Sequence, residues 1–354
     1  MNRRINVALL PVLAMAFAGG CEQPAAIDGA GIELRAEHLT VSPSTGPVTH
    51  VLVRNLGGRT YKGRVTAKFP PGWKMNTVSQ PVTVEPGKTE RLPFAIERGT
   101  DAADNAYPVE LSATGDGGAE PVTRRQTIVC ASAPYGRPTV DGKLDDWSGA
   151  IPVTFTTAGK RTTVSTHWSR RAFSLLVAVE EDALTPMPVG EGASAFDAVQ
   201  LALSPRNATT PASASGKAQR YEFVLAATKL GGRCYQMMRP GRSVAVAAQA
   251  RALTGLELDG TAVSITREGG TTYYEAAIPF KAMPLIRPDP GRELCFSLLV
   301  HDAGGTPLRD WGVPAGLSAT QRKRQAWCNW RGATRPHTPP MDNKIEWGFC
   351  SSKY

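Results

Sequence analysis

The chain has 354 residues, and its 40 Lys and Arg residues against 31 Asp and Glu residues give a net charge of +9. These charges are scattered, and the only dense basic run, Arg322-Lys323-Arg324, predicts a solvated loop or, as the alternative, a contact with anionic polymers or lipid. After the N-terminal segment no run of about 18 apolar residues follows, which excludes a further membrane-spanning helix.

The first 20 residues have the pattern of an export signal. Arg3 and Arg4 form a positive n-region, and residues 7–18 form a short apolar run. The sequence Ala18-Gly19-Gly20-Cys21 resembles a bacterial lipobox, in which the cysteine is acylated after cleavage. We therefore expect a lipoprotein signal peptide over 1–20 and lipidation of Cys21, with an ordinary cleaved signal as the alternative.

This signal predicts the cellular location of the protein. A lipid on Cys21 would anchor the chain to a membrane of the bacterial cell envelope. Glu22, rather than Asp, follows the cysteine and favours the outer membrane if the host is Gram-negative. Nucleic acid is not an expected partner of an exported chain. Removing 20 of the 354 residues leaves 334, which is enough for about two domains.

Five further cysteines would tend to pair in an oxidising compartment. Cys328 with Cys350 would hold the C-terminal segment, and Cys234 with Cys295 would join two strands. Because five is an odd number, we expect Cys130 to keep a free thiol. The sequence alone does not fix these pairs.

The first half of the mature chain predicts β-strands. A small, polar tether over 21–32 precedes a region, 33–130, in which apolar and polar residues alternate. Leu92, Phe94 and Ile96 form one such series, and Tyr107 to Ala113 form another. A period of two indicates strands with one buried face, and about a hundred residues of this kind favour a β-sandwich.

A resemblance supports this domain. Asn55-Leu56-Gly57-Gly58, Phe69-Pro70-Pro71-Gly72-Trp73 and Val84-Glu85-Pro86-Gly87 are similar to segments of NEW3-type immunoglobulin-like domains. The resemblance implies an immunoglobulin-like spacer. Trp73 would then pack in the core or at a turn, with ligand binding as the alternative.

Residues 134–354 again alternate with a period of two and predict a second β-sandwich. Phe173 to Val179, Tyr221 to Leu225 and Leu294 to Val300 are its clearest strands. No long stretch with a helical period of 3.6 is present. The chain is therefore expected to be all-β, with two β-sandwich domains.

Several motifs of this second region resemble family 9 carbohydrate-binding modules in their order along the chain. The opening is Pro138-Thr139-Val140-Asp141-Gly142-Lys143-Leu144-Asp145-Asp146-Trp147, followed by a strand that ends at Asp182. Then come Phe196-Asp197-Ala198-Val199-Gln200-Leu201, Tyr274-Glu275-Ala276-Ala277-Ile278-Pro279-Phe280, Phe296 to Asp302 and Trp347-Gly348. The resemblance implies a jelly-roll-like sandwich over 134–354 that binds a glycan or envelope polymer.

Sugar capture needs flat apolar faces for a pyranose ring and planar polar groups for its hydroxyls. The resemblance implies two aromatic side chains at the site, but Phe196 stands where the family has its first Trp, and candidates for the second are Trp311, Trp327 and Trp330. Polar partners would be Gln200, Arg220 and Glu222. For each Trp, packing against the terminal segment is the alternative.

Three aspartates in the opening motif predict a structural calcium site or a capped turn. Calcium binds several oxygens at loop ends, and Asp141, Asp145 and Asp146 would supply them, as would Glu180-Glu181-Asp182. The alternative is turn capping, because Asp141-Gly142 is an ordinary turn signal.

Catalytic patterns are missing from the sequence, which contains no G-x-S-x-G, H-E-x-x-H or Walker loop. We therefore expect a non-catalytic binder without a cofactor. Two alternatives stay open. One is a b-type haem domain with axial ligands among Met187, Met237, Met238, His167 and Lys217. The other is a scaffold that binds a protein partner.

Overall fold

The computed structural model describes residues 31–118, 120–188, 194–206, 216–243, 249–304, 309–312, 315, 327–328, 330–331 and 345–350. The expected signal peptide, Cys21, most of the tether and Arg322-Lys323-Arg324 lie outside these residues. No helix in the described ranges is long and apolar enough to cross a membrane.

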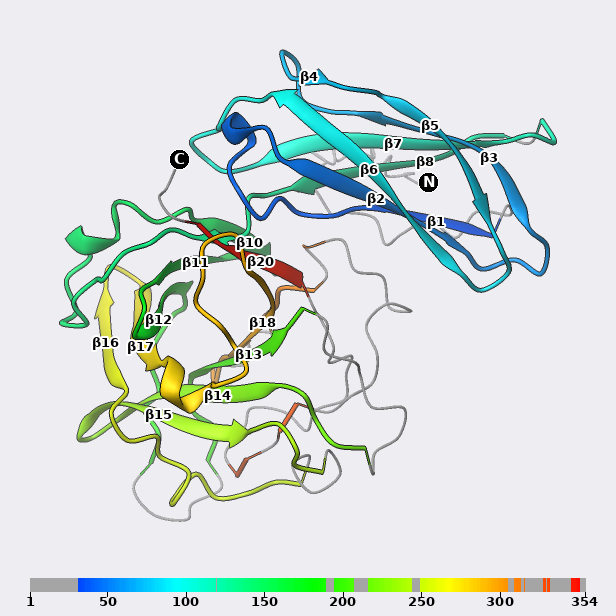
Figure 1. Ribbon diagram of the computed structural model, residues 1–354. Coiled ribbons are helices and arrows are strands. Elements are labelled where there is room, and N and C mark those ends of the chain that lie inside the picture. Colours follow the sequence, from blue (N-terminus) through cyan, green and yellow to red (C-terminus); the bar gives the residue numbers. More distant parts are fainter. Residues whose placement is uncertain are drawn as a thin grey trace, which may run out of the picture.

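The described chain is an all-β structure built from two sandwiches, which confirms the predicted fold class (Figure 1). In the first sandwich one sheet has the order β1-β2-β6-β4 and the other the order β5-β3-β7-β8. The bounds are β1 Ile32–Ala36, β2 Val48–Asn55, β3 Tyr61–Lys68, β4 Lys74–Met75, β5 Ser79–Val84, β6 Thr89–Arg98, β7 Tyr107–Gly115 and β8 Val122–Ile128. A short 3-10 turn, η1, covers Pro43–Thr45.

The second sandwich packs a five-stranded sheet, β10-β11-β12-β17-β16, against a seven-stranded sheet, β15-β14-β13-β18-β20-β9, in which β19 also pairs with β18. The bounds are β9 Ser132–Ala133, β10 Val153–Thr157, β11 Lys160–Trp168, β12 Ala172–Glu180, β13 Ala198–Pro205, β14 Tyr221–Thr228 and β15 Gly231–Met238. The remaining strands are β16 Ala262–Glu268, β17 Thr271–Pro279, β18 Glu293–His301, β19 Arg309–Asp310 and β20 Ile345–Phe349, and the 3-10 turns are η2 Asp145–Trp147 and η3 Phe280–Ala282.

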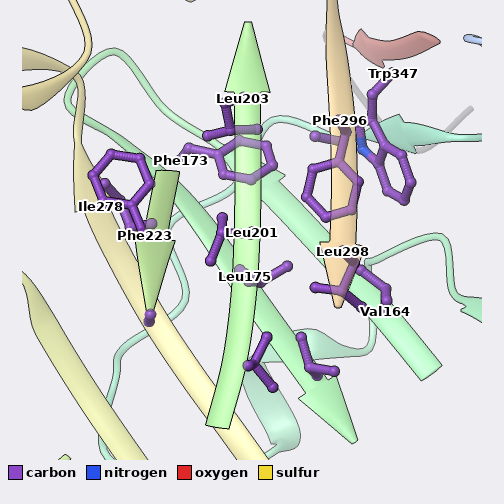
Figure 2. Close-up of a cluster of buried hydrophobic side chains, with 14 of the residues drawn as sticks. Val164, Phe173, Leu175, Leu201, Leu203, Phe223, Ile278, Phe296, Leu298 and Trp347 are labelled. Carbon is purple, nitrogen blue, oxygen red and sulfur yellow. The ribbon is translucent and has the colours of Figure 1, made fainter. Parts of the chain in front are cut away.

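The core of the second sandwich lies between its two sheets. Phe173 and Leu175 from β12 meet Leu201 from β13 and Phe296 from β18, and all four side chains are fully buried. Figure 2 shows these side chains converging on the space between the strands. Truncation of one such leucine to alanine costs about 2–5 kcal/mol of folding free energy, because a cavity is left behind.

Two motifs of the sequence meet at one corner of this sandwich. The indole Nε1 of Trp147 donates a hydrogen bond to Glu275 Oε1 at 2.9 Å, and the backbone N–H of Gly142 donates to Glu275 Oε2 at 2.9 Å. Trp147 and Glu275 are both buried. The Asp-Gly turn and its Trp therefore fasten the start of the domain to β17.

The two sandwiches are joined by packing and by polar contacts. Thr40 donates a hydrogen bond from its hydroxyl to Glu293 Oε1 at 2.8 Å, and His38 stacks on Trp311 with ring centroids 5.6 Å apart. Gly348 lies so close to the backbone carbonyl of Thr40 that no side chain would fit at that position. The terminal strand β20 thus links both sandwiches.

The predicted disulfides do not form. The cysteines Cys130, Cys234, Cys295, Cys328 and Cys350 are all buried with free thiols, as was expected only for Cys130. Two strands separate Cys234 on β15 from Cys295 on β18. At about 4.8 Å per strand their Cα atoms lie at least about 14 Å apart, beyond the roughly 7 Å that a disulfide spans.

The second predicted pair is separated along a strand. Cys328 contacts Gln200, which is opposite Leu299 on β18, whereas Cys350 follows β20, which pairs with the other end of β18 at Glu293. Six residues of strand between Leu299 and Glu293 correspond to about 20 Å. A Cys328–Cys350 bond is therefore ruled out in this fold.

Candidate functional site

Three predicted polar residues form one buried network on the outer face of the seven-stranded sheet. Arg220 Nε donates to Glu222 Oε1 at 2.6 Å, and Gln200 Nε2 donates to Glu222 Oε2 at 3.0 Å. The backbone of Cys328 is held from both sides, because its N–H donates to Glu222 Oε2 at 2.9 Å and its carbonyl accepts from Gln200 Nε2 at 3.1 Å. His301 Nε2 lies 3.0 Å from Gln200 Oε1. The network fixes the segment around Cys328 on the sheet.

The predicted aromatic residues do not form an open platform. Trp330 packs on His301 and Phe196, with ring centroids 4.4 Å and 6.1 Å apart, inside an outer apolar layer over β13, β14 and β15. Trp327 packs separately against Ala202 and Leu299. Both indoles are only 2% exposed, so neither offers a ring face to a ligand, and the expected two-aromatic sandwich is corrected to packing.

Trp311 lies elsewhere, in the main core. Its ring is 3% exposed and contacts Phe155 at a centroid distance of 5.3 Å, in addition to the stack with His38. The structure therefore brings Phe196 and Trp330 together with Gln200, Arg220 and Glu222, but it places Trp311 at the junction between the sandwiches.

The three aspartates of the opening motif lie in turns, where two of them accept backbone hydrogen bonds. Asp141 Oδ1 accepts the backbone N–H of Lys143 at 3.0 Å, and Asp146 Oδ2 accepts that of Thr139 at 2.9 Å, a bond that lowers the pKa of Asp146. Asp145 is exposed at the start of η2. Within the described ranges, no three His, Cys, Asp or Glu residues gather as metal ligands. The turn interpretation thus replaces the calcium site.

The haem candidates lie on different sheets. His167 belongs to β11 of the five-stranded sheet, where Nδ1 lies 3.1 Å from the carbonyl of Pro134 and burial lowers the pKa of the imidazole. Met187, Met237 and Met238 belong to the outer layer of the opposite sheet, and Lys217 is exposed. His167 and the methionines therefore do not converge on one axial site.

An open pocket lies beside the outer apolar layer, next to the β14–β15 hairpin. Its volume is about 250 Å³, and seven of its described lining residues are apolar while six are polar or charged. The apolar ones are Met187, Pro188, Phe196, Leu230, Tyr235, Ala252 and Leu253, and the others are Thr228, Lys229, Arg233, Thr254, Glu257 and Arg331.

Backbone hydrogen bonds hold the walls of this pocket together. Met187 N–H donates to the carbonyl of Ala227 at 2.8 Å, which joins the segment before β13 to β14. Gln236 N–H donates to the carbonyl of Leu256 at 2.8 Å, and Arg331 N–H donates to that of Arg251 at 3.0 Å. Four segments that are distant in sequence are thereby fixed around one hollow.

The chemistry of the pocket combines rings with hydrogen-bonding groups. Phe196 and Tyr235 are 2% and 4% exposed and form its base, whereas Leu230, 81% exposed, stands at the rim. Arg233 Nε lies 3.0 Å from Glu257 Oε1. Burial, followed by the charge of Glu257, raises the pKa of Tyr235 to about 12, so the phenol keeps its proton at neutral pH.

Of the residues predicted for ligand binding, only Phe196 lines this pocket. Tyr235, Arg233 and Glu257 were missed because nothing in their local sequence distinguishes them from other strand and loop residues. One feature of the sequence could have pointed to this pocket. Leu230 is an apolar residue in the turn Lys229-Leu230 before Gly231-Gly232, where a polar residue is the usual choice.

A second hollow lies at the opposite sheet, around the β16–β17 turn, and is lined largely by charged residues. Lys160 pairs with Asp182 at 2.7 Å and Arg161 with Glu180 at 2.6 Å, while Arg267 Nη1 lies 4.0 Å from Glu181 Oε1. The charges of the first two pairs compensate one another, and no aromatic side chain is present among the described lining residues. The hollow beside the β14–β15 hairpin is the better candidate for a ligand.

Comparisons with known proteins give no family for the chain. No family model and no curated protein matches it. Two solved structures of a family 9 carbohydrate-binding module from Caldicellulosiruptor kristjanssonii are similar at low level. The complex with glucose has 13% identity and a TM-score of 0.37 over 62% of this chain and 94% of that chain.

The complex with cellotriose has 14% identity and a TM-score of 0.32 over 48% of this chain and 75% of that chain. A FixG-related protein from Vibrio parahaemolyticus has 15% identity and a TM-score of 0.22 over 29% of this chain and 96% of that chain. These values are too low to assign a family or a ligand to the chain.

Proposed function

We propose that the protein is a non-catalytic carbohydrate-binding protein of the bacterial cell envelope, and that its second sandwich takes one sugar unit into the pocket beside the β14–β15 hairpin. The composition of that pocket carries the proposal. Aromatic and aliphatic side chains at its base suit the CH faces of a pyranose, and Arg233, Glu257 and Tyr235 supply donors and acceptors for hydroxyl groups.

The size of the pocket agrees with this ligand class. Sites for drug-sized ligands usually have volumes of about 300–1,000 Å³. A volume of about 250 Å³ therefore suits a single ring better than a long buried chain. The rest of an oligosaccharide would extend past the exposed rim at Leu230.

A cavity-filling substitution tests the site. Ala252 lines the pocket and is half-buried, so Ala252→Phe would place a ring in the space that the sugar needs. We expect calorimetric titration of the full chain with a panel of monosaccharides and disaccharides to find a ligand, and Ala252→Phe to weaken its binding at least about tenfold, or about 1.4 kcal/mol.

The matched control is Ala103→Phe, at an exposed position of the first sandwich, which should bind like the unmodified chain. Circular dichroism would verify that both variants fold. If no saccharide binds at millimolar concentration, or if Ala252→Phe binds as tightly as Ala103→Phe, the proposal is wrong for this pocket.

We also propose that Cys21 carries the lipid that holds the protein in the envelope, because the residues before it resemble a lipobox. The first sandwich would then stand between the membrane and the second sandwich. Metabolic labelling with an alkyne fatty acid should mark the chain, and Cys21→Ser should lose the label. A label that persists in Cys21→Ser would reject the anchor.

A further inference from the structure

Three arginines gather at one end of the second sandwich. Arg170 and Arg171 lie in the tight turn between β11 and β12. Arg137 lies in the neighbouring segment, where the N–H of Gly136 donates a 2.9 Å hydrogen bond to the carbonyl of Trp168, the last residue of β11. Because neighbouring strands are about 4.8 Å apart, the three exposed side chains share one small surface.

The positive charge of this surface is not compensated by ion pairs. Among the described residues, no carboxylate forms an ion pair with Arg137, Arg170 or Arg171. The opposite end of the same two strands differs, because Lys160 and Arg161 at the start of β11 are paired with carboxylates there, at 2.7 Å and 2.6 Å. The charge of the three arginines is therefore open to an outside partner.

The segment after β17 adds further cations. It begins beside the arginines, since the N–H of Phe280 donates to the carbonyl of Arg171 at 2.9 Å. The charged residues over 279–292 are Lys281, Arg287, Asp289 and Arg292, with Asp289 lying 3.8 Å from Arg292. At the margins, Asp146 accepts the N–H of Thr139 and Asp259 precedes Gly260 beside Lys281. Cations thus outnumber carboxylates at this end.

A fixed tyrosine ring stands among the arginines. Tyr135 is 41% exposed, and its ring packs edge-on against the buried Trp168, with centroids 5.0 Å apart. The guanidinium Nη2 of Arg137 lies 3.3 Å from Tyr135 Oη. An aromatic face suits the CH groups of a pyranose, and a guanidinium offers a planar pair of donors that matches a carboxylate.

We propose that this surface, defined by Tyr135, Arg137, Arg170 and Arg171, docks an acidic polysaccharide whose sugar rings carry carboxylates. A lipid surface is a weaker match, because membrane-binding faces add a broad apolar stripe to their cations, whereas the apolar group among these arginines is a single tyrosine ring. The surface is separate from the pocket beside the β14–β15 hairpin, so the inference goes beyond the proposed function and does not depend on it.

The test measures binding of the full chain to fluorescent polygalacturonate by anisotropy, with the fully methyl-esterified polymer as the uncharged ligand of the same backbone. In low salt we expect polygalacturonate to bind at least about tenfold more tightly, or about 1.4 kcal/mol. Raising the ionic strength to about 1 M should reduce this ratio, because the Debye length shortens to about 3 Å. The triple substitution Arg137→Gln, Arg170→Gln and Arg171→Gln should weaken polygalacturonate binding at least about tenfold.

The matched control removes three positive charges elsewhere. Arg59, Arg64 and Arg98 are exposed on the first sandwich, so replacing all three with Gln should leave polygalacturonate binding unchanged. Circular dichroism would verify that both triple variants fold. If both variants lose affinity equally, net charge rather than this surface attracts the polymer, and the inference fails.

Three other outcomes also overturn the inference. The first is that the unmodified chain binds neither polymer or binds both equally. The second is that it binds vesicles of phosphatidylglycerol but not polygalacturonate, which would make the surface a lipid contact. The third is that Ala252→Phe abolishes polygalacturonate binding, because the polymer would then enter the pocket. If Ala252→Phe binds polygalacturonate like the unmodified chain, the inference stands even where no neutral sugar binds and the proposed function fails.

Discussion

Glu181 offers a sharp test of the electrostatics inside the second sandwich. The residue follows β12 and is 3% exposed. Burial, with smaller contributions from Asp197 and Asp302, raises the pKa of this carboxyl from 4.5 to about 7, against the opposing effects of Thr272 and Arg309. We expect Glu181→Gln to stabilise the protein at alkaline pH.

The magnitude and its sign follow from proton linkage. Between pH 4.5 and about 7 the folded state binds more protons at Glu181 than the unfolded state does, so stability falls as pH rises through this window. Each tenfold change in proton affinity is worth about 1.4 kcal/mol. The cost of the ionised carboxylate therefore reaches about 3 kcal/mol above pH 7, and it is absent below pH 4.5. A glutamine does not carry this cost at any pH.

The assay is urea unfolding followed by tryptophan fluorescence at several pH values between 4.5 and 8.5. Glu181→Gln should match the unmodified protein at pH 4.5 and exceed it by about 3 kcal/mol at pH 8.5. The control is Glu180→Gln. Glu180 is the residue before Glu181, and its carboxylate forms a partly exposed ion pair with Arg161 that is worth about 0–1 kcal/mol. If the difference in unfolding free energy between Glu181→Gln and the unmodified protein were the same at every pH, the reasoning would be refuted.

Three further results are expected. Glu222→Ala should cost about 3–5 kcal/mol in urea unfolding, since it removes the buried carboxylate that accepts hydrogen bonds from Arg220, Gln200 and the backbone of Cys328, whereas Glu222→Gln should cost less; equal losses would contradict the ion-pair account. Burial and the charge of Arg35 lower the pKa of His38 from 6.5 to about 3, so the free energy of unfolding should fall progressively as the pH drops below 6.5. His38→Asn should make this fall smaller, and an unchanged pH dependence would argue against a neutral buried imidazole. Cys130, Cys234, Cys295, Cys328 and Cys350 should react with Ellman's reagent only after denaturation, and fewer than five reactive thiols in the denatured protein would reveal a disulfide.

The strands were readable from local sequence because a strand's pattern has a period of two. Phe94 and Ile96 of β6, like Tyr107, Val109 and Leu111 of β7, point into the first core as their alternation predicted. Such a pattern requires only that neighbouring residues face opposite sides of a sheet. The all-β class therefore followed from the sequence by itself.

The burial of the outer face of the seven-stranded sheet could not be predicted in this way. Alternation predicted that one face of β14 and β18 would be buried, yet nearly every side chain of both strands is buried, including Glu222. The reason is that Cys328 and Trp330, about a hundred residues from β14 in sequence, pack over this face. Glu222, which the sequence predicted to contact a ligand, thus binds the backbone of the chain itself.

The cysteines and the pocket depended on tertiary structure for the same reason. Sequence spacing says nothing about how many strands separate Cys234 from Cys295, and sheet order places two strands between them. The pocket collects Met187, Leu230, Leu253 and Arg331 from four segments. Local sequence determined which segments become strands, whereas long-range packing decided which of their side chains remain open to a ligand.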